Sequence, residues 1–185
     1  MAALERVGQA LRVQMWDMAK QHGVSPTQLQ VLLRLAGDPP ARRRIGVLAA
    51  ELDVTHPTLS DAVAVLRRKG LVHRDSGSRK AALSLSPRGQ ALAAELTDWD
   101  HRTRHQLADL PTADKRATLR LLLDLIAGLH SRGAITVARM CVTCRFFRRD
   151  AHPDPARPHH CALVDAPLGT GELRIDCAEH ESRVA

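Results

Sequence analysis

The sequence predicts a mainly α-helical fold in which two short helices joined by a turn are followed by a β-hairpin. Leu, Ala and Val supply most of the apolar residues, and the chain has two Trp, two Phe and no Tyr. This composition suits packed amphipathic helices better than a β-sandwich. Apolar residues also recur every three or four positions along much of the chain, and strict alternation appears only after residue 70.

Two helices are expected before the predicted helix-turn-helix. In the second, "SPTQ" forms a capping box, because Ser25 can cap the helix and Gln28 follows three residues later. Pro26 suits its first position, and "GDPP" ends it. The apolar stripe of the first helix contains Leu4, Val7, Leu11, Met15 and Met18, and the second is expected to bury Leu29, Leu32, Leu33 and Ala36.

The stretch "IGVLAAELDVTHPTLSDAVAVLRRKGLV" predicts a helix-turn-helix with its turn at 53–55. Thr55 is the expected N-cap of the second helix, and Pro57 is tolerated in the first turn. Leu48 faces inward on the first helix together with Val47 and Leu52. On the second helix the inward residues are Leu59, Ala62, Val63 and Leu66, whereas Pro57, Ser60, Asp61 and Arg68 lie near the opposite face.

The alternating residues around "DSGSRK" predict a two-stranded hairpin over about 71–86. A hairpin with a basic tip, directly after a recognition helix, is what a winged helix requires. Ser86 and Pro87 then open a helix that is expected to continue as far as Leu107. Thr112 is expected to cap a last helix that ends at Gly133.

The positive charge is concentrated in the predicted winged helix. The whole chain carries a formal net charge of +7, and residues 41–90 contain ten Lys or Arg against four Asp or Glu. Such an excess favours a polyanionic partner. A solvated charged face, or a winged helix used for protein contacts, is the alternative.

Residues 4–132 resemble the multiple antibiotic resistance regulator (MarR) family. The resemblance depends on "SPTQLQVLLRL", on the helix-turn-helix and on the exit from the wing, "LSLSPRG". It implies a homodimer in which the first and last helices of two chains interleave, and in which two recognition helices enter successive major grooves of a pseudo-palindromic operator. The expected DNA-binding and dimerisation domain is 1–133, and its expected DNA-binding residues are Thr55, His56, Pro57, Thr58, Ser60, Asp61, Arg68, Arg74, Arg79 and Lys80.

Two positions depart from the family's pattern. The wing usually holds an Asp two residues before an Arg; here the Arg matches Arg79, but the Asp position is Gly77. Arg79 can still reach the minor groove or a phosphate. Many members have a basic residue where this chain has Asp61, which can accept a hydrogen bond from cytosine but repels phosphates. Asp61 is therefore expected to select sequence at a cost in affinity.

All four cysteines lie in the expected second domain, 134–185, where helical periodicity ends and prolines accumulate. This segment has too few apolar residues for a core of its own, so it is expected to be an irregular tail held by a metal. The spacing C-x2-C-x16-C-x15-C provides a single knuckle, whereas structural zinc sites normally use two. The expected ligands are Cys141, Cys144, Cys161 and Cys177.

A [4Fe–4S] cluster is the first interpretation of these cysteines, because its corners take ligands from separated segments. "C-x-x-C-x-F-F", "HHCALVDAPLG" and "DCAEH" also resemble small cluster-binding domains related to high-potential iron–sulfur proteins. Phe146 and Phe147 would then shield the cluster, or else anchor the tail. Zn²⁺ is the alternative, with His159, His160 or His180 as a replacement ligand, and disulfides or free thiols come last.

Three functions follow from this sequence. The first is a regulator whose operator affinity depends on the cluster, which would sense redox state, oxygen or iron. The second is a regulator with structural zinc that senses a small aromatic or anionic ligand, and the third is a redox carrier on a winged-helix scaffold. No catalytic or nucleotide-binding motif is evident, so an enzyme is not expected. Charges interrupt the N-terminal segment and no apolar run reaches bilayer length, so we expect a cytoplasmic protein without a membrane partner.

Overall fold

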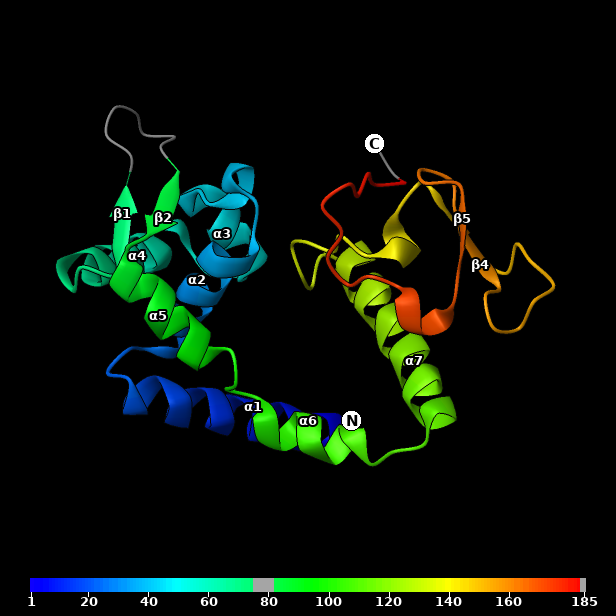
Figure 1. The fold of residues 1–185 in the computed structure, drawn as a ribbon, viewed down its shortest axis with the longest axis horizontal. Helices are drawn as coiled ribbons and strands as arrows, with labels where there is room; N and C mark the ends of the chain where they lie inside the picture. Colours follow the sequence, from blue (N-terminus) through cyan, green and yellow to red (C-terminus); the bar gives the residue numbers. More distant parts are fainter. Residues whose placement is uncertain (75–81, 184–185) are drawn as a thin grey trace. The chain divides into compact units, whose positions relative to one another are not determined.

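The structure is a computed structural model that describes residues 1–74 and 82–183 (Figure 1). The chain divides into two compact units, Met1–Ala108 and Asp109–Ala185. None of the helices in the described ranges is both long enough and apolar enough to cross a membrane.

The N-terminal unit contains the predicted helix-turn-helix and hairpin. Its elements are α1 (Ala2–Gln21), α2 (Pro26–Gly37), η1 (Pro40–Arg42), α3 (Ile45–Glu51), α4 (His56–Arg68), β1 (Val72–Arg74), β2 (Leu83–Leu85), α5 (Pro87–Leu96) and α6 (His101–Ala108). Strands β1 and β2 pair antiparallel, with Val72 opposite Leu85 and Arg74 opposite Leu83.

The predicted helix starts are present. Ser25 Oγ accepts the N–H of Gln28 at 3.2 Å, and Gln28 Oε1 accepts the N–H of Ser25 at 3.1 Å, which completes the capping box of α2. Thr55 caps α4 by accepting the N–H of Thr58. At the turn between α3 and α4, Asp53 adopts a φ of 49°.

The core of this unit lies between α2, α3, α4 and α5. Leu29 and Leu32 of α2 are fully buried, as are Leu48 of α3 and Leu59 of α4. Ala62, Val63 and Leu66 are buried as predicted. The prediction for Ala36 was wrong, because this residue is exposed. Leu35 is buried instead, so the last core-facing residue of α2 lies one position earlier than predicted.

The residues that lead from the wing into α5 contact the short segment between α4 and β1. Ser86 caps α5 by accepting the N–H of Gly89 at 3.0 Å, and its hydroxyl donates to the carbonyl of Gly70 at 2.7 Å. A Cβ at Gly89 would lie 2.0 Å from the carbonyl oxygen of Leu71. Gly89 therefore permits close packing of α5 against the chain that enters β1, which explains the Ser and Gly of the "LSPRG" motif physically.

The helix predicted to run from Pro87 to Leu107 is interrupted. Helix α5 ends at Leu96, and a turn over 97–100 separates it from α6. The hydroxyl of Thr97 donates to the carbonyl of Ala93, a local bond that competes with the regular helix. Trp99 packs against the core from this turn.

The C-terminal unit corrects the prediction of an irregular tail. Its elements are α7 (Thr112–Ser131), η2 (Cys141–Thr143), β3 (Phe147–Arg148), β4 (His159–Cys161), β5 (Ala166–Leu168) and η3 (Thr170–Glu172). The three strands form an antiparallel sheet in the order β3-β4-β5. Thr112 is the first residue of α7 rather than its cap, which is Pro111, and Gly133 follows the helix with a φ of 72°.

Helix α7 supplies the apolar surface that the cysteine-rich segment lacks. Leu123 of α7 is buried with Met140, Phe147 and Leu173, and Ile126 packs against the same cluster. In Figure 1, α7 runs alongside the segments drawn in yellow to red. The tail therefore has a core, which could not be recognised from its own composition because part of that core belongs to α7.

A second apolar face of α7 is exposed within this unit. Leu121 is 68% exposed, and Leu122, Leu125 and Leu129 are also exposed. The 20-residue helix therefore has apolar residues both on the face that packs on the tail and on one that does not.

Candidate nucleic-acid interface and four-cysteine site

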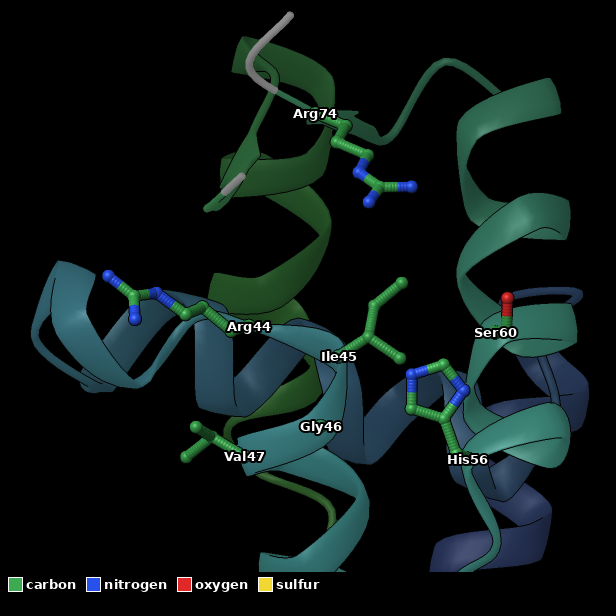
Figure 2. A pocket seen from close by; sticks show the side chains of 7 residues that line it. All are labelled: Arg44, Ile45, Gly46, Val47, His56, Ser60 and Arg74. Atoms are coloured by element: carbon green, nitrogen blue, oxygen red, sulfur yellow. The ribbon is translucent and has the colours of Figure 1, made fainter. Parts of the chain in front are cut away.

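An open cavity of about 520 Å³ lies where α3, α4 and β1 meet (Figure 2). It is lined by Arg44, Ile45, Gly46, Val47, His56, Ser60 and Arg74. His56 and Ser60 lie one turn apart on α4, so they share a face of the helix. Figure 2 shows Arg74 extending from β1 toward the space above Ile45, whereas Arg44 lies at the α3 edge of the cavity.

The cavity favours an anionic partner. Among the residues that the structure describes, its lining contains two arginines and a histidine and no carboxylate. It also lies beside the N-terminal turn of α4, where unpaired backbone N–H groups and the helix dipole attract anions. Pro57, Thr58 and Asp61 are exposed on the same helix. Together these residues form a basic concave surface with exposed polar side chains, which suits the backbone and base edges of nucleic acid.

Sequence reasoning missed Arg44 as a site residue. Arg42, Arg43 and Arg44 are consecutive in the basic stretch "ARRR", but the structure gives them different contacts. Arg42 pairs with Glu51 at 3.0 Å and with Asp38 at 3.4 Å, and the Glu51 side chain is only 1% exposed. Arg43 Nε donates to the carbonyl of Asp38 at 2.7 Å.

These internal contacts position the loop beside the wing. The carbonyl of Arg43 accepts the N–H of Leu83 in β2 at 2.7 Å, which ties the loop to the hairpin. Arg44 comes next as the exposed N-cap residue of α3. Its position immediately before a predicted helix could have identified Arg44 as a site residue.

The structure brings together only some of the predicted DNA-binding residues. His56, Ser60 and Arg74 line the cavity described above. Thr55 has a structural role, since its hydroxyl caps α4 and lies 2.7 Å from that of Thr58. Arg79 and Lys80, with Gly77, lie outside the described residues.

Arg68 lies in the last turn of α4 and lines a different cavity, of about 580 Å³. Lys69 and Arg88 contribute further positive charge to that cavity. His22 and Glu95 pair with each other there at 3.3 Å.

Backbone contacts join the segments that carry the four cysteines in the C-terminal unit. The N–H of Cys141 donates to the carbonyl of Arg174 at 3.0 Å, and the N–H of Arg174 donates to Cys141 Sγ at 3.2 Å. Cys144 forms a β-bridge with Ser182, and Cys161 pairs with Phe147 across β3 and β4. These contacts connect the knuckle at 141–144 to the segments that carry Cys161 and Cys177.

The pKa values of two of these thiols are raised by their surroundings. Burial raises the pKa of the Cys141 thiol, and charge interactions with Cys177, Cys161 and Cys144 raise it further. Burial likewise raises the pKa of Cys177, which lies 3.3 Å from Glu179 Oε2. All four are free thiols in this structure. Within residues 1–74 and 82–183, no three His, Cys, Asp or Glu side chains are arranged to hold a single metal ion.

The three histidines considered as replacement ligands have other contacts. His159 Nδ1 accepts the N–H of Asp150 at 3.3 Å. His160 lies 3.1 Å from His152 through one ring nitrogen and 3.4 Å from Asp165 through the other. His180 Nε2 lies 3.0 Å from Thr143 Oγ1.

Comparison with known proteins supports the fold. Residues 22–81 match the model of the MarR family. The Staphylococcus aureus MepR–DNA complex is similar, with 18% identity and a TM-score of 0.60 over 69% of this chain and 94% of that one. The transcriptional regulator PA3341 has 24% identity and a TM-score of 0.60 over 70% of this chain and 97% of that one.

A third similar structure is the Mycobacterium tuberculosis MarR family protein Rv2887 in complex with p-aminosalicylic acid. It has 26% identity and a TM-score of 0.50 over 67% of this chain and 95% of that one. No protein with a curated description matches the sequence. The helix-turn-helix and the hairpin β1–β2 of this chain therefore form a winged helix similar in fold to those of these MarR family structures.

Proposed function

We propose that this chain is a DNA-binding transcriptional regulator of the MarR type that binds a pseudo-palindromic operator. The observation that carries the proposal is the basic cavity at the N-terminal half of α4, whose described lining includes Arg44, His56 and Arg74. The S. aureus MepR structure, which contains DNA, supports this use of the fold.

In this proposal, α4 enters the major groove and each exposed group has a separate task. Ser60 and Asp61 read base edges, because they lie on the outward face of the recognition helix. Arg44 and Arg74 contact phosphates, which fixes the orientation of the helix. The wing residue Arg79 adds a minor-groove or phosphate contact.

The chain would act as a homodimer. Exposed apolar residues lie on α1 in the N-terminal unit, including Leu4, Val7 and Trp16, and on the second face of α7 in the C-terminal unit. Burial of such residues against a second copy provides the driving force for association.

The separate roles of Arg79 and Asp61 can be tested by measuring how two variants bind sets of operator-length duplexes. Arg79→Ala is expected to weaken binding to all duplexes, because a phosphate contact carries little sequence information. Asp61→Ala is expected to change which duplexes are preferred. A uniform effect of both substitutions would contradict the assignment.

We further propose that a metal group held by the four cysteines modulates operator affinity. The packing of α7 supports this link, since Leu123 shares its apolar cluster with Met140, Cys141 and Cys144. Loss of the group would loosen this packing and alter the dimer surface on the other face of α7. The signal would be redox state, oxygen or iron if the group is a [4Fe–4S] cluster.

Anaerobically purified protein and the same protein after loss of its metal should therefore differ in operator affinity. Equal affinities would contradict metal control. If a bound cluster cycled reversibly with no change in affinity, the redox-carrier alternative would be favoured.

A second candidate function places sensing in the N-terminal unit and gives the C-terminal unit a structural zinc. The cavity of about 580 Å³ lined by Arg68, Lys69 and Arg88 favours it, because these cations suit a small organic anion. Rv2887 was crystallised with p-aminosalicylic acid, a compound of that class. Titration with aromatic carboxylates should then weaken operator binding, and Arg88→Ala should abolish the response without changing metal content.

A further inference from the structure

We propose that Cys141, Cys144, Cys161 and Cys177 are the four ligands of a [4Fe–4S] cluster, and that Arg174 positions two of them and sets the cluster's reduction potential. This inference deepens the proposed metal control of DNA binding and depends on it for its biological role. The four cysteines and Arg174 all lie within the C-terminal unit.

Backbone hydrogen bonds bring the four ligand segments together independently of any metal. The Cys141–Arg174 pair joins the first knuckle to the segment before Cys177. The N–H of Cys177 donates to the carbonyl of Arg139 at 2.9 Å, just ahead of that knuckle. The sheet places Cys161 on the central strand β4. A chain that gathers four thiols in this way provides the ligands of one group.

A cationic metal suits these cysteines, because ligand thiols bind as thiolates. Iron ions between four thiolates would remove their mutual repulsion. Arg183 adds positive charge nearby, with its Nε 3.0 Å from the carbonyl of Cys144.

The spacing of the cysteines along the chain favours a cluster over one zinc ion. Structural zinc sites normally use two C-x2-C knuckles, whereas Cys161 and Cys177 stand apart from the single knuckle at 141–144. A cubane cluster has a separate iron for each cysteine, so it takes ligands from separated segments. His160 is engaged through both ring nitrogens, which favours four cysteines over three cysteines and this histidine.

Arg174 connects two of the four ligands. Its backbone N–H donates to Cys141 Sγ at 3.2 Å. Its guanidinium lies 3.7 Å from Glu179 Oε2, the carboxylate oxygen that lies 3.3 Å from Cys177 Sγ, so Glu179 holds it at this edge of the site. N–H···S bonds and nearby positive charge stabilise the reduced, more negative state of a cluster. Arg174 is therefore a positioning residue whose charge raises the reduction potential.

The first test is metal and sulfide analysis with visible absorption on the full chain purified without oxygen. We expect a brown protein with about four irons and four sulfides per chain. Cys161→Ser should lose this content, whereas His160→Asn should keep it. A colourless chain with one zinc, a chain with two disulfides, or iron loss in His160→Asn would overturn the proposal.

The second test compares Arg174→Gln with Arg157→Gln, whose guanidinium pairs with Glu172 at 2.9 Å rather than with a thiol. The reduction potential should become more negative in Arg174→Gln and stay unchanged in Arg157→Gln. Equal potentials in both variants, at full iron content, would refute the role of Arg174.

These results are separable from the proposed DNA binding. A colourless chain that binds its duplex would refute the cluster only. A brown chain that binds no duplex would refute the regulator function and support the site.

Discussion

Replacement of Gly89 by alanine should destabilise the N-terminal unit through one backbone contact. The new Cβ would lie 2.0 Å from the carbonyl oxygen of Leu71, whereas ordinary contacts begin near 3.4 Å, so α5 and the entry to β1 must separate by about 1.4 Å. Neither atom belongs to a flexible side chain. Overpacking of this kind costs about 1–3 kcal/mol, and the displacement of β1 should also weaken DNA binding.

The assay for Gly89→Ala is urea unfolding followed by tryptophan fluorescence. Trp16 and Trp99 are the chain's two tryptophans and both lie in the N-terminal unit, so the signal reports that unit. Gly37→Ala is the matched control, because nothing lies within 4 Å of its added Cβ. If both variants unfolded at the same urea concentration, the packing argument for the wing exit would be wrong.

Three further substitutions test the surface and its support. Arg44→Ala should lower the slope of log affinity against log salt by about 0.9 for each lost phosphate contact, or about 1.8 per dimer; Arg116→Ala, an exposed charge on α7, should leave the slope unchanged. Glu51→Ala leaves Arg42 without its main partner and should cost about 3 kcal/mol in unfolding free energy, measured by urea titration. Ser25→Ala removes the capping box of α2 and should cost about 1 kcal/mol in the same measurement.

The helix-turn-helix could be predicted from sequence because its signals are local. Ser25 and Thr55 are caps whose partners lie three residues away. The buried positions of α4 follow the helical repeat from Leu59 to Leu66. Each of these features needs only neighbouring residues, so periodicity and capping chemistry were sufficient.

The features that sequence reasoning missed depend on contacts between distant residues. Arg42 and Arg44 cannot be told apart in the stretch "ARRR". In the fold, Arg42 pairs with Glu51 and so stabilises the unit, whereas Arg44 lines the cavity. The sheet β3-β4-β5 was missed because its strands have two or three residues each and its apolar support, Leu123, lies on α7. Arg174 could not be identified without the fold that brings it to Cys141.

Selection of bound duplexes from a random pool tests whether α4 reads an operator. The purified chain should enrich a pseudo-palindrome whose half-sites are centred about 10 base pairs apart, as two recognition helices in successive major grooves require. The Asp61→Ala variant should enrich a different sequence in each half-site. Absence of any enriched sequence, or enrichment of the same sequence by both proteins, would contradict the assignment of α4 as the reading element.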